Sequence, residues 1–321
     1  MASRYRLLVT RKLSPEVEAR AARDYDAVFN PDDRTFSAEE LIAACQDVDA
    51  VLPCHSEAFT APVIAALPER LRVIANHSVG VDHVDLEAAR ARGIIVTNTP
   101  DVLSDATAEI AILCMLGAAR RGAEGHRLVQ EGKWDSWSPS FMVGRQVTGK
   151  RFGILGMGGV GQAAAERARG FAMEIHYHNR KPLPEAQAKG AVYHETPESL
   201  ISSSDVLSLH CPATPQTRGL MNAERIAMMP QGAILVNTAR GALVDEDALI
   251  AALKSRHLFA AGLDVFQTEP GGNPGLSALD NVFLLPHIGS ATVETRIAMG
   301  NRALDNLDAA LCGEAPPDRV A

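Results

Sequence analysis

Short apolar runs alternate with helix-like segments along almost the whole chain. In the first hundred residues the strand-like runs are 5–10, 50–53, 72–76 and 94–97. Between these runs we expect helices from Pro15, over 62–66 and over 86–92, the last one closed by Gly93. Strands that alternate with helices in this way predict βαβ units and a parallel sheet.

The middle of the chain interrupts this alternation. Segment 105–121 has small apolar residues on nearly every face of a helix, so we expect a long, buried helix there. Segment 132–147 contains both tryptophans with Ser, Pro and Gly and shows no clear period, which predicts a loop or arm. A second alternating series begins at Lys150, with strands at 151–155, 174–178, 206–209, 233–237, 260–264 and 282–285, and a last helix at about 290–312.

Length and composition narrow the class of protein. A chain of 321 residues favours two domains. The net charge of −8 argues against a general nucleic-acid binder, which would carry a basic face. The five cysteines are widely spaced and form no C-x-x-C motif, which favours reduced thiols in a cytosolic protein. We find neither a signal-peptide core at the start nor an apolar run of ~18 residues, so we expect a cytoplasmic protein.

A glycine-rich turn marks the start of the second series. Strand 151–155 leads into the sequence G-M-G-G-V-G at 156–161, and a helix pattern follows at once. In such a turn Gly156 permits the tight bend, Gly158 lets the backbone approach a pyrophosphate, and Gly161 lets helix and strand pack closely. Because strand, turn and helix occur in the required order, we interpret the turn as a dinucleotide site rather than an ordinary βα turn.

The end of the next strand bears on the choice of cofactor. An NAD site usually places Asp or Glu there, whereas this chain has Asn179 followed by Arg180 and Lys181. The two cations would attract the 2′-phosphate of NADP, which a carboxylate would repel. A solvated basic turn at a strand end is the alternative.

Three ionisable residues follow three later strands of the same series. Arg240, Glu269 and His287 come after the strands at 233–237, 260–264 and 282–285. Each alone has an ordinary structural explanation, such as a helix-cap contact or a surface carboxylate. Ligands of open α/β sheets bind at the carboxyl ends of strands, so together they predict an acid/base pair and an anion clamp near the nucleotide.

With these motifs the chain resembles the D-isomer-specific 2-hydroxyacid dehydrogenases over essentially its whole length. The resemblance rests on S-V-G-V-D-H-V-D at 78–85, the glycine-rich turn and the three segments that carry Arg240, Glu269 and His287. It implies an α/β fold of two Rossmann-like domains with parallel sheets and an active site in the cleft between them. The expected domains are a discontinuous substrate-binding domain, 1–101 plus 287–321, and an NAD(P)-binding domain, 102–286. The latter includes a dimerisation helix and arm (about 105–147) that would make a homodimer.

The resemblance also implies residue roles. Arg240, Glu269 and His287 would be catalytic, and Asp264 would orient the nicotinamide carboxamide. The substrate would contact Ser78, Val79, Gly80, Leu103, Arg240 and His287, with Cys54, His55 and Trp137 as weaker pocket candidates. No metal is expected. The cofactor would contact Thr107, Gly156, Met157, Gly158, Gly159, Val160, Gly161, Asn179, Arg180, Lys181, Cys211, Pro212, Thr217, Thr238, Ala239, Asp264 and Gly289.

The expected function is NAD(P)H-dependent reduction of a small 2-oxo acid, such as glyoxylate or hydroxypyruvate, to the D-2-hydroxy acid, and the reverse. We expect NADP(H) to be preferred and NAD(H) to be usable. One alternative is a nucleotide-sensing binding protein like the C-terminal-binding co-repressors, which share this fold. A reductase of a larger 2-oxo acid is another. A formate dehydrogenase is disfavoured because that group carries Gln where this chain has Glu269.

Overall fold

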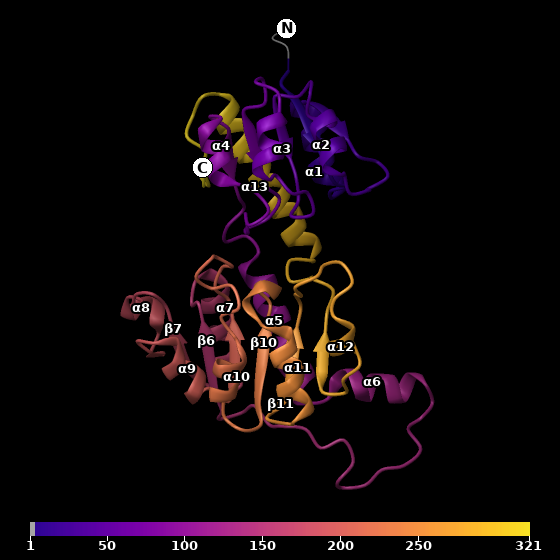
Figure 1. The fold of residues 1–321 in the computed structure, drawn as a ribbon, viewed down its shortest axis with the longest axis vertical. Coiled ribbons are helices and arrows are strands. Elements are labelled where there is room, and N and C mark those ends of the chain that lie inside the picture. Colours follow the sequence, from indigo (N-terminus) through magenta and orange to yellow (C-terminus); the bar gives the residue numbers. More distant parts are fainter. Residues whose placement is uncertain (1–3) are drawn as a thin grey trace. The chain divides into compact units, whose positions relative to one another are not determined.

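The computed structural model describes residues 4–321, which divide into two compact units (Figure 1). Unit 1 comprises the residues up to Leu103 together with Ser290–Ala321, and unit 2 is Ser104–Gly289. From the sequence we expect the boundaries at 101/102 and 286/287, slightly before the observed divisions. Each unit is built on a parallel sheet covered by helices, which confirms the predicted fold class.

Unit 1 contains a five-stranded parallel sheet in the order β2-β1-β3-β4-β5. Its strands are β1 (Arg6–Val9), β2 (Asp26–Phe29), β3 (Ala50–Leu52), β4 (Val73–Ala75) and β5 (Ile95–Thr97). Its helices are α1 (Pro15–Asp24), α2 (Ala38–Ala44), α3 (Ala61–Ala66), α4 (Leu86–Ala91) and α13 (Val293–Leu311). The four strands predicted from apolar runs are present. The edge strand β2 escapes prediction because it buries little of its surface and so needs few apolar residues.

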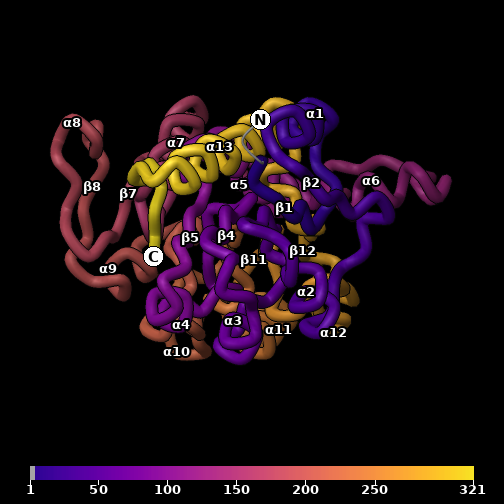
Figure 2. Tube along the Cα trace, turned by 90° about the horizontal axis from the view of Figure 1, so that it is seen from above, coloured from indigo at the N-terminus to yellow at the C-terminus, as the bar shows by residue number. Residues whose placement is uncertain are grey.

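The last helix completes unit 1 by packing beside α1, as Figure 2 shows. Gly300 makes this contact close, because a Cβ there would lie 2.5 Å from a methyl carbon of Val17. Arg20 of α1 donates to Asp305 and Asp308 of α13 at 2.7 and 2.8 Å. The two ends of the sequence therefore build one core.

Unit 2 contains a seven-stranded parallel sheet in the order β12-β11-β10-β9-β6-β7-β8. Its strands are β6 (Arg151–Leu155), β7 (Glu174–His178), β8 (Val192–Tyr193), β9 (Val206–Leu209), β10 (Ala233–Asn237), β11 (Leu258–Leu263) and β12 (Val282–Leu284). Its helices are α5 (Ser104–Ala119), α6 (Gly122–Gln130), α7 (Gly159–Arg169), α8 (Glu185–Ala188), α9 (Pro197–Ser203), α10 (Ala223–Met228), α11 (Glu246–Lys254) and α12 (Pro274–Ser277). Helices α5 and α7 cover one face of the sheet, and α9, α10 and α11 cover the other.

Helix α5 lies directly on the sheet but is shorter than predicted. A Cβ at Gly262 of β11 would meet the carbonyl oxygen of Cys114 at 2.5 Å, so the helix and strand backbones nearly touch. The predicted helix 105–121 ends at Ala119, because Arg121 adopts a left-handed φ of 54° and α6 begins beside it. Leu113 is exposed, although we expect burial on nearly every face. Despite the apolarity of α5, no helix among the described residues could span a membrane.

After α6, residues 131–147 contain no helix or strand, which agrees with the predicted loop or arm. We call this segment the arm. In both views of unit 2, α6 extends away from the layered sheet and helices (Figures 1 and 2). Helix α6 itself is not predicted from the sequence, because its two glycines and polar residues give a weak helix pattern.

Unit 1 contains a buried histidine, His77, just after β4. Its Nε2 lies 3.3 Å from the carbonyl oxygen of Arg296, which is also in unit 1. Burial, with a smaller contribution from the positive charge of Arg296, lowers the pKa of His77 to about 4. The folded protein therefore keeps this ring neutral under mildly acidic conditions.

This lowered pKa predicts a loss of stability in acid. Between pH 6.5 and 4 the unfolded chain protonates this histidine while the folded chain does not. The free energy of unfolding should therefore fall by about 1.4 kcal/mol per pH unit in this window, with no further loss from His77 below it. His77→Gln cannot titrate, so urea unfolding at pH 6.5 and 5 should show a smaller difference than in the wild type. Equal differences in the two proteins would contradict the prediction.

Candidate active site

The order of strands in unit 2 brings the three predicted catalytic segments together. Strands β10, β11 and β12 are adjacent and parallel, with Asn237 paired to Leu263 and Leu263 paired to Leu284 at their carboxyl ends. Arg240, Glu269 and His287 follow these three ends in turn. Parallel pairing therefore delivers an Arg, a Glu and a His to the same edge of one sheet.

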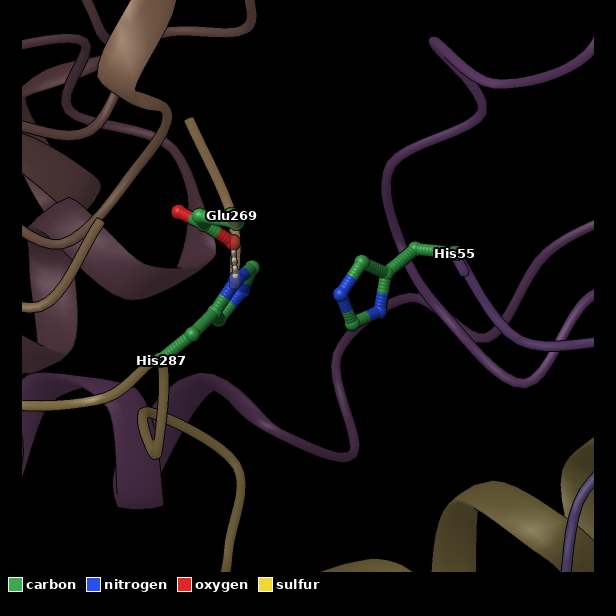
Figure 3. A group of neighbouring side chains, drawn as sticks. All are labelled: His55, Glu269 and His287. Atoms are coloured by element: carbon green, nitrogen blue, oxygen red, sulfur yellow. Dashed lines mark hydrogen bonds and ion pairs between the residues drawn. The ribbon is translucent and has the colours of Figure 1, made fainter. Parts of the chain in front are cut away.

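Glu269 and His287 form a direct pair at this edge (Figure 3). Nδ1 of His287 lies 2.5 Å from Oε2 of Glu269, and Oε1 of Glu269 accepts the backbone N–H of Phe266 at 2.7 Å. Both carboxylate oxygens are thus engaged, which fixes the orientation of the side chain. The side chains of His287 and Glu269 are 29% and 26% exposed, so the pair is partly desolvated yet accessible from solution.

The loop that carries His287 is fixed by a buried carboxylate. Asp264, at the end of β11, accepts the backbone N–H groups of Ile288 and Gly289 at 2.8 and 2.7 Å. Burial raises the pKa of Asp264, and these backbone hydrogen bonds act in the opposite direction. His287 has a left-handed φ of 54°, so its backbone needs this support. The predicted role of Asp264 toward the nicotinamide carboxamide stays a prediction.

The turn that carries Arg240 is fixed in a similar way by Asn237, the last residue of β10. The buried Asn237 amide donates to the carbonyl of Arg240 at 2.8 Å and accepts the backbone N–H of Ala239 at 3.0 Å. The guanidinium of Arg240 in turn donates to the carbonyl of Ala239 at 2.8 Å. Asn237 is not predicted from the sequence, although a polar amide at the end of an apolar strand is a usable signal.

The glycine-rich turn lies where the strand order reverses, between β6 and β9. Gly156 has φ of 97°, and a Cβ there would lie 2.6 Å from the backbone nitrogen of Cys211 after β9. A Cβ at Gly161 would lie 2.6 Å from the carbonyl oxygen of Gly156. At Gly158, by contrast, a Cβ would meet nothing within 4 Å. The two outer glycines allow close packing and the middle one faces open space, as a pyrophosphate-binding turn requires.

Other predicted cofactor residues border the same edge. Thr107 and Asp264 both lie within 3.5 Å of a Cβ built on Gly289, so these three residues form one group. The hydroxyl of Thr238 is buried and has no hydrogen-bond partner among the described residues, as expected of a group that awaits a ligand. Together with the glycine turn, this unpaired hydroxyl indicates that the edge fits a nicotinamide dinucleotide.

Two predicted cofactor contacts are engaged within the protein. Asn179 does not extend outward, because its Oδ1 accepts the backbone N–H of Met157 at 2.7 Å and its amide nitrogen is 3.4 Å from the carbonyl of Met157. The hydroxyl of Thr217 donates to the carbonyl of Pro212 at 2.6 Å. Arg180 and Lys181 are exposed, next to Asn179.

In unit 1 the predicted substrate turn follows β4. The carbonyls of Ser78, Val79 and Gly80 accept hydrogen bonds from Thr99, Asn98 and Ser78 respectively, at 3.0, 2.9 and 2.7 Å. With its carbonyls held inside the unit, the turn can present N–H groups to an anion.

The remaining pocket candidates are spread over both units. Cys54 and His55 follow β3, and burial raises the pKa of Cys54 to about 12, which excludes a thiolate at neutral pH. Leu103 ends the first segment of unit 1, and Trp137 is 76% exposed in the arm. Their roles toward a substrate stay predictions.

Comparison with known proteins identifies the family. The model of the D-isomer-specific 2-hydroxyacid dehydrogenase NAD-binding domain matches residues 112–289. The chain belongs to the D-isomer-specific 2-hydroxyacid dehydrogenases. As a member of this dehydrogenase family it is an oxidoreductase that acts on the CH–OH group of 2-hydroxy acids with a nicotinamide cofactor. The expectation of an enzyme is therefore confirmed.

Individual dehydrogenases of the family match nearly end to end. Glycerate dehydrogenase from Hyphomicrobium methylovorum is 43% identical, over 97% of each chain. Glyoxylate reductase from Thermococcus kodakarensis is 41% identical, over 99% of this chain and 96% of its own length. The NADPH-dependent glyoxylate/hydroxypyruvate reductase from Sinorhizobium meliloti, solved with NADP and malonate, is 34% identical with a TM-score of 0.87. That match covers 99% of this chain and 97% of the other.

Proposed function

We propose that this dehydrogenase reduces glyoxylate, hydroxypyruvate and similar small 2-oxo acids to D-2-hydroxy acids, and catalyses the reverse reaction. The hydrogen-bonded pair of Glu269 and His287 carries this proposal, because it is suited to acid/base chemistry and lies at the same edge of the sheet as the glycine-rich turn. The names of the relatives support the substrate class, since they are glycerate dehydrogenase and glyoxylate reductases. Larger 2-oxo acids are the competing substrate class.

His287 is the proposed proton donor. A bound nicotinamide cofactor supplies the hydride that the carbonyl carbon receives. Negative charge grows on the carbonyl oxygen at the same time, and His287 transfers a proton to that oxygen from Nε2. Glu269 holds the Nδ1–H and stabilises the imidazolium until the proton has moved. In the oxidative direction His287 takes the proton back from the substrate hydroxyl.

Arg240 is the proposed binding group for the substrate carboxylate. Its guanidinium can form two parallel, charge-assisted hydrogen bonds to a carboxylate and can polarise the neighbouring carbonyl. The buried amide of Asn237 supports this role, because it fixes the turn on which Arg240 stands. The turn at Ser78–Gly80 of unit 1 is separately proposed to contact the substrate.

NADPH is the proposed preferred cofactor, with NADH still used. No carboxylate stands at position 179 to repel a 2′-phosphate, and Arg180 and Lys181 add two exposed positive charges beside it. The amide of Asn179 is directed to the backbone of Met157, so it supports the glycine turn. This arrangement leaves recognition of the phosphate to the two cations.

A homodimer formed through the segment from α5 to the arm (about 105–147) is the proposed assembly. This segment exposes large apolar side chains that a single copy of the chain leaves in water. The exposed side chains are Val129, Trp134, Trp137, Phe141 and Val143. Large exposed apolar side chains gathered in one segment are typical of protein interfaces. Leu113 of α5 is exposed as well.

The role of His287 as proton donor can be tested by replacing it with a side chain that cannot donate a proton to the substrate. His287→Gln should lower kcat for reduction of glyoxylate and hydroxypyruvate by about 100- to 10,000-fold, the usual contribution of general acid catalysis. Binding of NADPH should survive, because the substituted side chain serves the substrate. Steady-state kinetics and fluorescence titration with NADPH measure the two effects. The matched control is His257→Gln, which changes a histidine before the amino end of β11 and should leave kcat unchanged. Near-normal turnover of His287→Gln would refute the assignment.

The role of Arg240 can be tested without removing its charge. Arg240→Lys keeps a cation but loses the planar fork, so two parallel hydrogen bonds become impossible. The KM for the 2-oxo acid should rise about tenfold or more, because one charged hydrogen bond is worth about 1.5–3 kcal/mol. The KM for NADPH should change little. The opposite pattern would show that Arg240 serves the nucleotide.

The cofactor preference can be tested and reversed. One good contact to the 2′-phosphate predicts a roughly ten- to hundredfold higher kcat/KM with NADPH than with NADH. Asn179→Asp combined with Arg180→Ala should reverse the order, because it adds a repelling charge and removes an attracting one. Lys181→Ala alone shows how much Lys181, as opposed to Arg180, contributes to the preference for NADPH. A wild-type preference for NADH would show that both cations only face solvent.

A further inference from the structure

Glu246 is a buried carboxylate with no cationic partner among residues 4–321. It is the first residue of α11, directly after the N-cap Asp245. Both of its oxygens accept hydrogen bonds from the neighbouring loop. Oε1 accepts the backbone N–H of Gln267 at 2.7 Å, and Oε2 accepts the side-chain amide of Asn273 at 2.7 Å. These two donors flank Glu269 in the sequence.

The helix start explains why a charge is tolerated at this buried position. The first turn of a helix presents unpaired N–H groups and the positive end of the helix dipole, both of which stabilise an anion. Two charge-assisted hydrogen bonds from the loop compensate further for lost hydration. A carboxylate is also the side chain that can accept on both of its ends at once. The position therefore suits an anionic tether better than a neutral amide.

Further contacts join the Glu269 loop to the segment that carries Arg240. The side chain of Gln267 donates to the carbonyl of Val244 at 2.6 Å. Gly241 lies against the loop so closely that a Cβ there would be 1.9 Å from the carbonyl carbon of Phe266. The backbone from Arg240 to Glu246 thus supports the loop from Phe266 to Asn273 at several points.

We propose that Glu246 is a positioning residue, which tethers the loop of Glu269 and thereby sets the geometry of the Glu269–His287 pair. This inference rests on the proposed roles of Glu269 and His287. The side chain of Glu269 is held by hydrogen bonds to Phe266 and His287. A small shift of the loop would change the geometry of both bonds. A displacement of about 1 Å in a catalytic group can cost about a hundredfold in rate. A tether on both sides of Glu269 restricts such displacements.

Glu246→Gln breaks one half of the tether. The new amide can still accept from Gln267 through its oxygen, but its NH₂ then faces the NH₂ of Asn273. We expect kcat for reduction to fall by about 10- to 100-fold, with little change in the KM for NADPH. The pH at which reduction falls to half should also move lower, because the carboxylate of Glu269 is less well placed to stabilise the imidazolium. Glu269→Gln should move the pH profile in the same direction and further.

The double variant Glu246→Gln with Asn273→Asp provides the rescue. It reverses one hydrogen bond, so that the Gln amide donates to the new carboxylate. The other oxygen of that carboxylate can keep the backbone N–H of Gly275, which Asn273 accepts at 2.8 Å. Both kcat and the pH profile should return toward the wild-type values. The matched control is Asp247→Asn, which removes an exposed charge one residue away and should change neither.

The experiment separates this inference from the proposed function. If Glu269→Gln moves the pH profile and Glu246→Gln does not, the positioning role is overturned while the roles of Glu269 and His287 stand. If the double variant regains thermal stability but neither kcat nor the pH profile, Glu246 serves the fold alone and the inference is likewise wrong. If Glu269→Gln leaves the profile unchanged, the proposed acid/base pair fails and the inference fails with it.

Discussion

Parallel pairing of β10, β11 and β12 is the constraint on which the rest of this site depends. Because parallel strands all end at the same edge, the loops that follow them must share that edge whatever their sequences. The chain uses this to bring a cation, a carboxylate and an imidazole to one side of one sheet. None of these residues needs to be close to another in the sequence.

The strand ends fix only the position of the loops, and a second set of polar residues fixes their conformation. Asn237 holds the turn of Arg240, Asp264 holds the loop of His287, and Glu246 contacts the loop of Glu269 on both sides. Each of these supporting side chains is buried, and each bonds backbone atoms. Low solvent exposure makes such bonds costly to break, so the three loops are held more firmly than exposed loops usually are.

Much of this arrangement could be predicted from the sequence, and the reasons for the rest are physical. Strands β6, β7, β9 and β10 match the predicted strands residue for residue. Strands β9 and β10 are easy to predict because they are buried throughout and mostly apolar, as is usual in a parallel sheet. Edge strand β2 and helix α6 lack such a pattern, since each buries little. The supporting side chain Glu246 could not be recognised, because its partners belong to a loop whose conformation no periodicity encodes. Asn179 is predicted as a cofactor contact, but its hydrogen bond to the glycine turn could not be predicted, for the same reason.

Gly241 has a consequence for how this active site can change over evolutionary time. A side chain at this position would collide with the backbone of Phe266 and Gln267, so the segment of Arg240 and the loop of Glu269 have no space between them. An insertion or a bulkier residue in either segment would therefore displace the other. These two segments can therefore change only together. The proposed anion-binding segment and the loop of the proposed acid/base pair are thus inherited as one piece.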